Sequence, residues 1–236
     1  MTITIGNFLF RYRNSLFPLT CLLLLLPGPR LFSDPWQAAL LGLCIAVPGQ
    51  IVRAVTIGFD YIVRGGRQGK VHAEGLVISG VYRISRNPMY VGNVLIAAGL
   101  GVASNSVAAL ALSIPMVLFV YACIVAAEEA YLSTRFGRSY EDYRRCVPRW
   151  LPGVFAVRGV LSGARFHWRR VVVKEYGTPA GWIAILCGIT LRNVWIAGMW
   201  TDSRAAVSAI IVVIAATFVL WLTARVLKKM RFLTAD

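Results

Sequence analysis

Long stretches without charge dominate the chain and predict helices that cross a membrane. No charged residue occurs at positions 17–29, 88–127 or 205–224. A helix needs about 20 mostly apolar residues to cross the hydrocarbon core, and in lipid its backbone must satisfy its own hydrogen bonds. The stretch 88–127 is long enough for two spans joined by a turn at Ser104-Asn105-Ser106. The pattern therefore predicts an all-α, polytopic transmembrane helical bundle of about six spans. They are Leu16–Leu26 (extended upstream towards Phe8), Trp36–Ile57, Pro88–Ala103, Val107–Ala127, Pro179–Trp195 and Ala205–Ala224.

The first of these spans has a competing interpretation. Its short apolar run follows Arg11 and Arg13, as in a secretory signal peptide. The residues that come after it, Pro27-Gly28-Pro29-Arg30, make a poor small-residue cleavage site, which favours a retained span.

Composition and charge agree with a membrane protein and orient it. The chain is 58% hydrophobic and 15% charged, whereas a soluble domain is about 45–50% apolar and about 25% charged. With both termini in the cytoplasm, 21 of the 25 Lys and Arg residues fall on that side, as the positive-inside rule requires, and Arg53 lies inside a span. Anionic lipid headgroups then account for the net charge of +15, and nucleic acid is not needed. The five cysteines and two histidines form no cluster, so no metal is expected.

Two polar segments, 60–87 and 128–176, interrupt the spans on the predicted cytoplasmic side. The fourth span is expected to continue as a helix to Gly137, and a new helix to run from Ser139 until Pro148 ends it. Phe136, Tyr140 and Tyr143 recur at helical spacing, a pattern more typical of packing than of a cofactor site. We expect N-terminal helices over 1–63, a functional core over 64–152, and a basic amphipathic segment with two further spans over 153–236.

Two motifs at helix ends could carry chemistry. Pro88 suits the first turn of a helix, and Arg86 and Asn87 directly before it would make that turn an anion site. Without a ligand, the same segment is a basic helix start in which tyrosines at 82 and 90 anchor at the membrane interface. Glu128-Glu129 ends the fourth span, where carboxylates are costly without partners. They either pair with arginines such as Arg86 or bind the hydroxyls or amine of a nucleotide-like ligand.

The order of motifs over residues 76–152 resembles the isoprenylcysteine carboxyl methyltransferase family and its phospholipid methyltransferase relatives. It runs Gly-x-Tyr-Arg, Arg-Asn-Pro-x-Tyr-x-Gly, a two-span hairpin, Glu-Glu, Phe-Gly-x-x-Tyr-x-x-Tyr, then Val-Pro-Arg-x-x-Pro. The resemblance implies S-adenosylmethionine bound at the cytoplasmic face. The implied cofactor-binding residues are Val77, Gly80, Val81, Tyr82, Arg86, Asn87, Tyr90, Glu128 and Glu129.

The resemblance also suggests roles. Arg86 and Asn87 would hold the cofactor carboxylate, and Glu128 or Glu129 would bind its ribose or amine. Arg149 would lie at the entrance for the substrate. Glu129 and Arg149 are the catalytic candidates. This chain has Asn87 where well-known members have His, and an amide can donate a hydrogen bond but cannot titrate. The implied acceptor is lipid-like or prenylated, and an amine acceptor would need a base such as Glu128, Glu129 or Tyr90.

Two other functions fit the same pattern less well. A sterol-type reductase shares a similar hairpin but uses NADPH, and no pocket for a 2′-phosphate is evident. A membrane scaffold or lipid carrier would not need the polar residues gathered on one side. We therefore expect a methyltransferase of the bacterial inner membrane with its cofactor site in the cytoplasm. We also expect the small hairpin residues Gly92 and Gly99 to flank a lateral entrance for the acceptor.

Overall fold

The computed structural model describes residues 2–59, 73, 75–151, 165–230 and 232, with the backbone alone at 14–17. This part of the chain contains helices and turns and no strands, which confirms the all-α prediction. The helices are α1 (Thr2–Cys21), α2 (Pro35–Phe59), α3 (Pro88–Ala103), α4 (Val107–Phe136), α5 (Arg138–Cys146), α6 (Trp168–Glu175), α7 (Gly177–Ile196) and α8 (Arg204–Lys229), with 3₁₀ turns η1 (Leu22–Leu25) and η2 (Gly80–Arg83).

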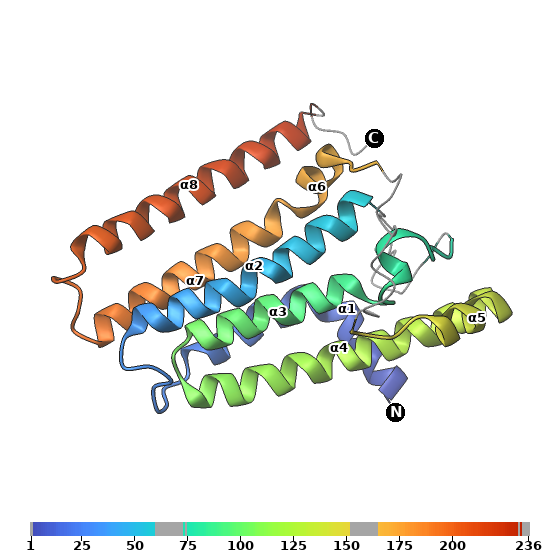
Figure 1. Ribbon diagram of the computed structural model, residues 1–236, viewed down its shortest axis with the longest axis horizontal. Helices are drawn as coiled ribbons and strands as arrows, with labels where there is room; N and C mark the ends of the chain where they lie inside the picture. Colours follow the sequence, from blue (N-terminus) through green and yellow to red (C-terminus); the bar gives the residue numbers. More distant parts are fainter. Residues whose placement is uncertain (1, 60–72, 74, 152–164, 231, 233–236) are drawn as a thin grey trace.

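The long helices lie side by side along one axis (Figure 1). In that view α8 is outermost, α7 and α2 follow, and then come α3 and α4. The short helices α5 and α6 lie at one end of the bundle, and so do the beginning of α1 and the end of α8. The two ends of the described chain therefore share one end of the molecule, as the predicted topology requires.

Four of the described helices are long and apolar enough to cross a membrane: α2, α4, α7 and α8. Helix α3 is apolar but only 16 residues long, and α1 carries Arg11 and Arg13. The predicted count of six spans is thus confirmed for four. Helix α1 also begins at Thr2, well before the predicted span. Its first residues are not apolar enough for hydropathy to select them, but they pack against α4. The contact is close, because a Cβ added at Gly6 would meet the Cys123 carbonyl.

Helices α2 and α3 approach each other through small residues. A Cβ placed on Gly92 would lie 2.7 Å from the carbonyl oxygen of Gly49, and one on Gly99 would lie 2.8 Å from the Cβ of Ala46. Small residues allow such close backbone contact between membrane helices. Gly92 and Gly99 are therefore packing residues of the α2–α3 interface, and the lateral entrance for an acceptor stays a prediction.

Helix α4 extends beyond the hydrocarbon core. Its 30 residues measure about 45 Å at 1.5 Å per residue, against about 30 Å for the core. It ends where predicted, at Gly137, whose φ of +51° favours glycine. Helix α5 then runs to Cys146, before Pro148, also as predicted. The pair Glu128-Glu129 lies about 32 Å along α4 from Val107, which places both carboxylates near one edge of the core.

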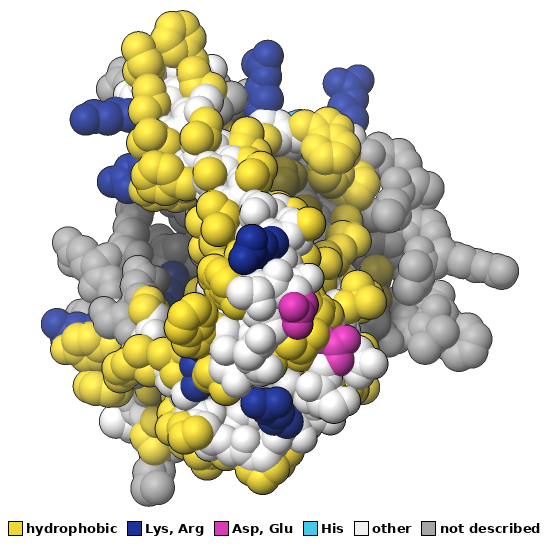
Figure 2. Space-filling model, turned by 90° about the vertical axis from the view of Figure 1, so that its left-hand side faces the viewer, with side chains coloured by type: hydrophobic (Ala, Val, Ile, Leu, Met, Phe, Trp, Pro, Cys, Tyr) yellow, Lys and Arg dark blue, Asp and Glu magenta, His cyan; other side chains and the backbone are white. Residues whose placement is uncertain are grey.

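Charge is distributed unequally between the two ends of the bundle. Figure 2 looks at the end opposite α5 and α6, where hydrophobic side chains predominate and charged side chains are few. Among the described residues, the segments at that end carry only Arg30, Arg192 and Arg204 with Asp34 and Asp202. These three arginines are the ones predicted to lie outside the cytoplasm.

Candidate functional site

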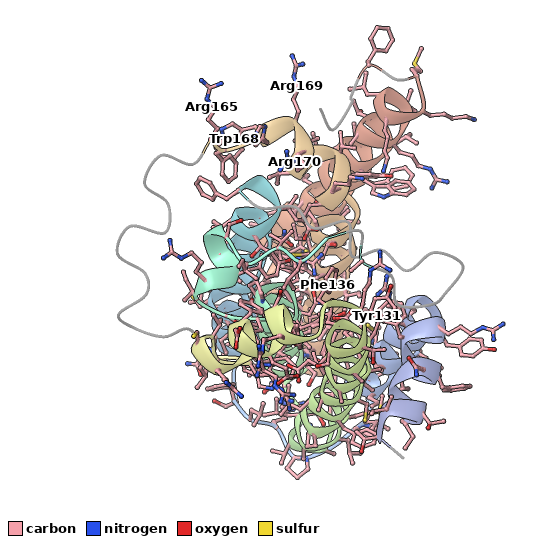
Figure 3. The ribbon with its side chains drawn as sticks, turned by 90° about the vertical axis from the view of Figure 1, so that its right-hand side faces the viewer. Tyr131, Phe136, Arg165, Trp168, Arg169 and Arg170 are labelled. Carbon is pink, nitrogen blue, oxygen red and sulfur yellow. The ribbon has the colours of Figure 1, made fainter. Side chains whose placement is uncertain are left out.

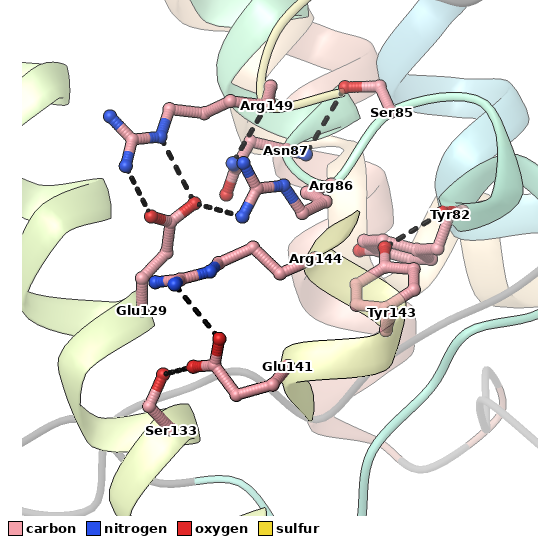
Figure 4. Close-up of polar contacts among 10 residues, drawn as sticks. All are labelled: Tyr82, Ser85, Arg86, Asn87, Glu129, Ser133, Glu141, Tyr143, Arg144 and Arg149. Carbon is pink, nitrogen blue, oxygen red and sulfur yellow. Dashed lines mark hydrogen bonds and ion pairs between the residues drawn. The ribbon is translucent and has the colours of Figure 1, made fainter. Parts of the chain in front are cut away.

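Two motifs that are about 60 residues apart in the sequence are joined by hydrogen bonds (Figure 4). The loop before α3 donates three of them to the backbone of residues 148–150. The Ser85 hydroxyl donates to the Trp150 carbonyl (2.9 Å), the Arg86 amide to the Pro148 carbonyl (2.9 Å), and the Asn87 side-chain amide to the Arg149 carbonyl (3.0 Å). The Val-Pro-Arg motif, which has no catalytic logic of its own, thus holds the Arg-Asn-Pro motif in place.

Glu129 lies between two arginines, one from each motif. Its Oε1 is 3.0 Å from Nη1 of Arg86, and its Oε2 is 2.5 Å from Nη2 of Arg149, whose Nε also donates to Oε1 at 3.2 Å. Glu129 and Arg86 are buried, while the side chain of Arg149 is half exposed. Burial of a carboxylate requires such partners. The structure therefore brings together two arginines that sequence reasoning assigned to separate cofactor and substrate positions.

Glu128 points elsewhere, because adjacent residues of a helix are about 100° apart around its axis. Its Oε1 accepts a 2.7 Å hydrogen bond from the Tyr90 hydroxyl of α3. The Tyr90 ring lies 5.0 Å from that of Tyr121 on α4. Glu128 is buried as well. The two carboxylates, either of which was predicted to bind the cofactor's ribose or amine, therefore have separate partners.

Four further residues of the predicted cofactor site lie within or just before the η2 turn. Gly80 opens it with a φ of +53°, and Val81 and Tyr82 are buried within it, while Val77 is half-buried upstream. The Tyr143 hydroxyl of α5 donates to the Tyr82 carbonyl at 2.7 Å (Figure 4). The predicted aromatic stripe is a packing feature, as the spacing favoured: Tyr140 and Tyr143 are core residues, joined by the partly buried Phe136 in a cluster with Ala73, Leu132 and Val147.

A cavity of about 540 Å³ begins beside these motifs and extends between the helices. Its polar end includes four of the predicted residues, Tyr82, Asn87, Tyr90 and Glu128. Its apolar end is lined by side chains such as Ile96, Ala97, Leu100, Val117 and Ile124. The other predicted residues, Val77, Gly80, Val81, Arg86, Glu129 and Arg149, do not line it. The site thus divides into residues that face the cavity and residues that hold its wall.

Sequence reasoning missed a second polar group in the cavity wall. Arg53 of α2 forms a bidentate ion pair with Glu175 of α6, Nε to Oε1 at 2.5 Å and Nη2 to Oε2 at 2.8 Å. Arg53 also donates to the side chains of Asn93 on α3 and Thr178 on α7. An arginine within an apolar span is a candidate functional residue in itself, and this signal was present in the sequence. Its partner Glu175 was hidden within a basic segment 122 positions away.

Comparisons with known proteins confirm the predicted family. Residues 39–139 match the phospholipid methyltransferase family. Protein-S-isoprenylcysteine O-methyltransferase of Schizosaccharomyces pombe is 36% identical over 52% of this chain, and protein-S-isoprenylcysteine O-methyltransferase B of Arabidopsis thaliana is 31% identical over 50%. These matches span 51% and 61% of the two relatives. The cobalt-zinc-cadmium resistance protein CzcN of Cupriavidus metallidurans is 28% identical over 66% of this chain and 70% of its own length. No solved structure matches.

The helical bundle, the apolar spans and these matches together define an integral membrane protein that is similar to membrane methyltransferases. Its central segment matches the phospholipid methyltransferase family and is similar to protein-S-isoprenylcysteine O-methyltransferases. The family-matched residues 39–139 contain all of α3 and α4 and most of α2, whereas α6, α7 and α8 lie beyond them. Within the described residues, no group of three or more His, Cys, Asp or Glu side chains is placed to hold a metal ion.

Proposed function

We propose that this protein transfers a methyl group from S-adenosylmethionine to a lipid-like acceptor, at the cytoplasmic face of a bacterial inner membrane. The observation that carries the proposal is the cavity, whose polar end is built from the family's motif residues and whose apolar end lies between α1, α3 and α4. A single cavity with two such ends suits two ligands that differ in their preference for water. The charge asymmetry of the bundle supports the orientation.

The cavity suits the cofactor in size and in chemistry. Its volume of about 540 Å³ falls within the range of about 300–1,000 Å³ that is usual for small-molecule sites. The Glu128 carboxylate would accept hydrogen bonds from the cofactor's amine or ribose hydroxyls, and the Asn87 amide would donate to its carboxylate. Tyr82 would provide a packing surface. We assign Arg86, Glu129 and Arg149 a positioning role, because they pair with one another behind the cavity wall.

S-adenosylmethionine, when bound, supplies an electrophilic methyl group on a sulfonium. The chain's own contribution is to hold the acceptor's nucleophile beside that group and to exclude water. A carboxylate acceptor is ionised at neutral pH and needs no base. For an amine acceptor the proton would pass to Glu128, which lines the cavity and already accepts a hydrogen bond from Tyr90.

The apolar end of the cavity supports an amphiphilic acceptor. Asn87 and Leu100 are 13 residues apart at the two ends of the lining contributed by α3, which corresponds to about 20 Å along the helix. Such a distance accommodates a long hydrocarbon or prenyl chain. The acceptor would place its tail among the spans and its nucleophile near Glu128.

Incubation of the purified protein with methyl-labelled S-adenosylmethionine and a total membrane extract tests the proposal. We expect the label to enter an organic-extractable product, and calorimetry in detergent to show binding of the cofactor and its demethylated product. Glu128→Gln is expected to reduce both signals. Glu141→Gln on α5, outside the cavity lining, is the matched control. Binding of NADPH in place of S-adenosylmethionine would contradict the proposal and support a sterol-type reductase.

A further inference from the structure

A basic surface lies at the end of the bundle beside the cavity and outside the family-matched residues. It is formed by α6, the residues before it and the last turns of α8. Figure 3 shows Arg165 and Arg169 projecting outward from this end, close to Trp168 and Arg170. We call it the α6–α8 basic surface, and it comprises Arg165, Arg169, Arg170, Arg225 and Lys229.

The two helices of this surface are attached to each other. The Lys228 ammonium of α8 donates to the Val173 carbonyl of α6 at 3.1 Å and lies 5.3 Å from the centre of the Tyr176 ring. The described residues of α6 and α8 include one acidic side chain, Glu175, which is buried and paired with Arg53. The outward cations therefore have no counter-charge within their own helices.

Helix α6 differs in exposure between its two turns. Trp168, at its first position, is 71% exposed, whereas Val173 and Glu175 in its second turn are buried. Phe166 stacks edge-on against both Phe59 and Trp168, so an aromatic group anchors the start of the helix. Tryptophan and arginine together are typical of a membrane–water interface. The position of α6 agrees, because the spanning helix α7 follows it directly.

We propose that the α6–α8 basic surface binds anionic phospholipid headgroups and that this contact holds α6 in place against the cavity wall. The link is the last residue of the same two-turn helix, Glu175, which lines the cavity and pairs with Arg53. Lipid held at the exposed beginning of the helix thus fixes the helix whose buried end completes the site. The effect on turnover rests on the proposed methyltransferase function, whereas headgroup binding does not.

Binding is tested on the full chain in detergent with fluorescent phosphatidylglycerol and phosphatidylcholine. Each basic residue near an anionic surface contributes roughly fivefold to affinity. We expect tighter binding of phosphatidylglycerol, and a loss of at least about tenfold in R165Q/R169Q, which removes two exposed cations. R138Q/R145Q on α5 makes the same change of charge and is expected to bind like the unmodified protein, because Arg145 is already close to Asp142. Soluble glycerophosphoglycerol is expected not to compete.

Three outcomes would overturn the binding proposal. They are equal affinity for the two lipids, an equal loss in both double variants, and full competition by the soluble headgroup, which would indicate a free phosphate site. Capture of an acidic protein with no lipid preference would equally contradict it.

Turnover is measured separately, in phosphatidylcholine vesicles with and without phosphatidylglycerol. We expect the anionic lipid to raise turnover of the unmodified protein several-fold and to have little effect on R165Q/R169Q. Lipid preference without any methyl transfer would contradict the proposed function but leave the headgroup site standing. Methyl transfer that is indifferent to lipid charge, together with normal headgroup binding, would remove the link through α6.

Discussion

At the scale of single residues, Glu129 is the point at which the two motifs meet. It forms ion pairs with Arg86 of the loop before α3 and with Arg149 of the segment after α5. Without its charge, two guanidinium groups would face each other, one of them buried. Breaking a buried ion pair from one side is costly because the remaining charge stays uncompensated.

We expect Glu129→Gln to lower the affinity for S-adenosylmethionine about tenfold or more, because the loop that carries Asn87 would lose its anchor. Calorimetry measures the affinity, and thermal unfolding in detergent measures the loss of stability. Glu141→Gln is the control, since the pair of Glu141 with Arg144 is partly exposed and worth about 0–1 kcal/mol. Unchanged affinity in Glu129→Gln would contradict a positioning role.

Short motifs made part of the site predictable from sequence. Arg86, Asn87 and Glu128-Glu129 stand at the ends of apolar helices, where charged and polar residues are conspicuous. The pairing of Arg53 with Glu175 could not be predicted, because it depends on where the bundle places α6. A single sequence contains no information on contacts between segments 122 positions apart.

The Arg53–Glu175 pair leads to a prediction of its own. Arg53→Met leaves a buried carboxylate uncompensated and is expected to destabilise the protein by about 3–5 kcal/mol. The double change Arg53→Met with Glu175→Leu removes both charges and is expected to restore most of that stability. A double-mutant cycle in detergent unfolding measures the coupling, with Arg145→Met as an exposed control. Additive effects of the two single changes would show that the pair is not coupled.

At the scale of elements, the residues at which helices begin and end were predicted better than the contacts between helices. Pro88 begins α3 and Gly137 ends α4 because proline lacks an amide and glycine tolerates positive φ. Helix α1 was only partly predicted, since its first half is stabilised by contact with α4 and not by hydropathy. The α2–α3 interface was likewise not predicted, because glycine in an apolar run has several possible roles.

That interface can be tested by exchanging glycines. Gly99→Leu inserts a side chain where even a Cβ would lie 2.8 Å from the backbone nitrogen of Ala46, so we expect it to destabilise the protein by about 1–3 kcal/mol or more. Gly188→Leu on α7 makes the same change at an exposed position with no atom within 4 Å of the added Cβ. Thermal unfolding in detergent compares the two. Equal stability of both variants would contradict close α2–α3 packing.

At the scale of the whole molecule, the cavity has polar lining residues at one end and apolar lining residues at the other. The polar end lies beside Glu128, near the edge of the hydrocarbon core, and the apolar end reaches Leu100 among the spans. Hydropathy and charge predicted one apolar and one polar side. They did not predict which residues line the cavity, because α1 and α6 contribute lining residues from outside the family-matched segment.

Ala97→Phe tests the apolar end without touching the polar one. The larger ring would fill part of the cavity between α3 and α4, so we expect a several-fold higher KM for a long-chain acceptor and an unchanged affinity for S-adenosylmethionine. Acceptors with and without an alkyl or prenyl tail provide the comparison. Efficient methylation of a short, water-soluble acceptor, with no gain from a tail, would contradict the lipid-like acceptor.

The near-complete exposure of α8 has a consequence for how this protein diverges. Val207 is the one buried residue among the described side chains of that helix, whereas α4 has 12 buried residues, distributed from Ala109 to Leu132. A side chain that faces lipid is selected for its transfer free energy and not for its fit to a neighbour, and many apolar residues satisfy that condition equally. Mutations in α8 can therefore accumulate as neutral drift within a limit on hydropathy. Over long divergence such a helix loses recognisable ancestry while it keeps its place in the bundle.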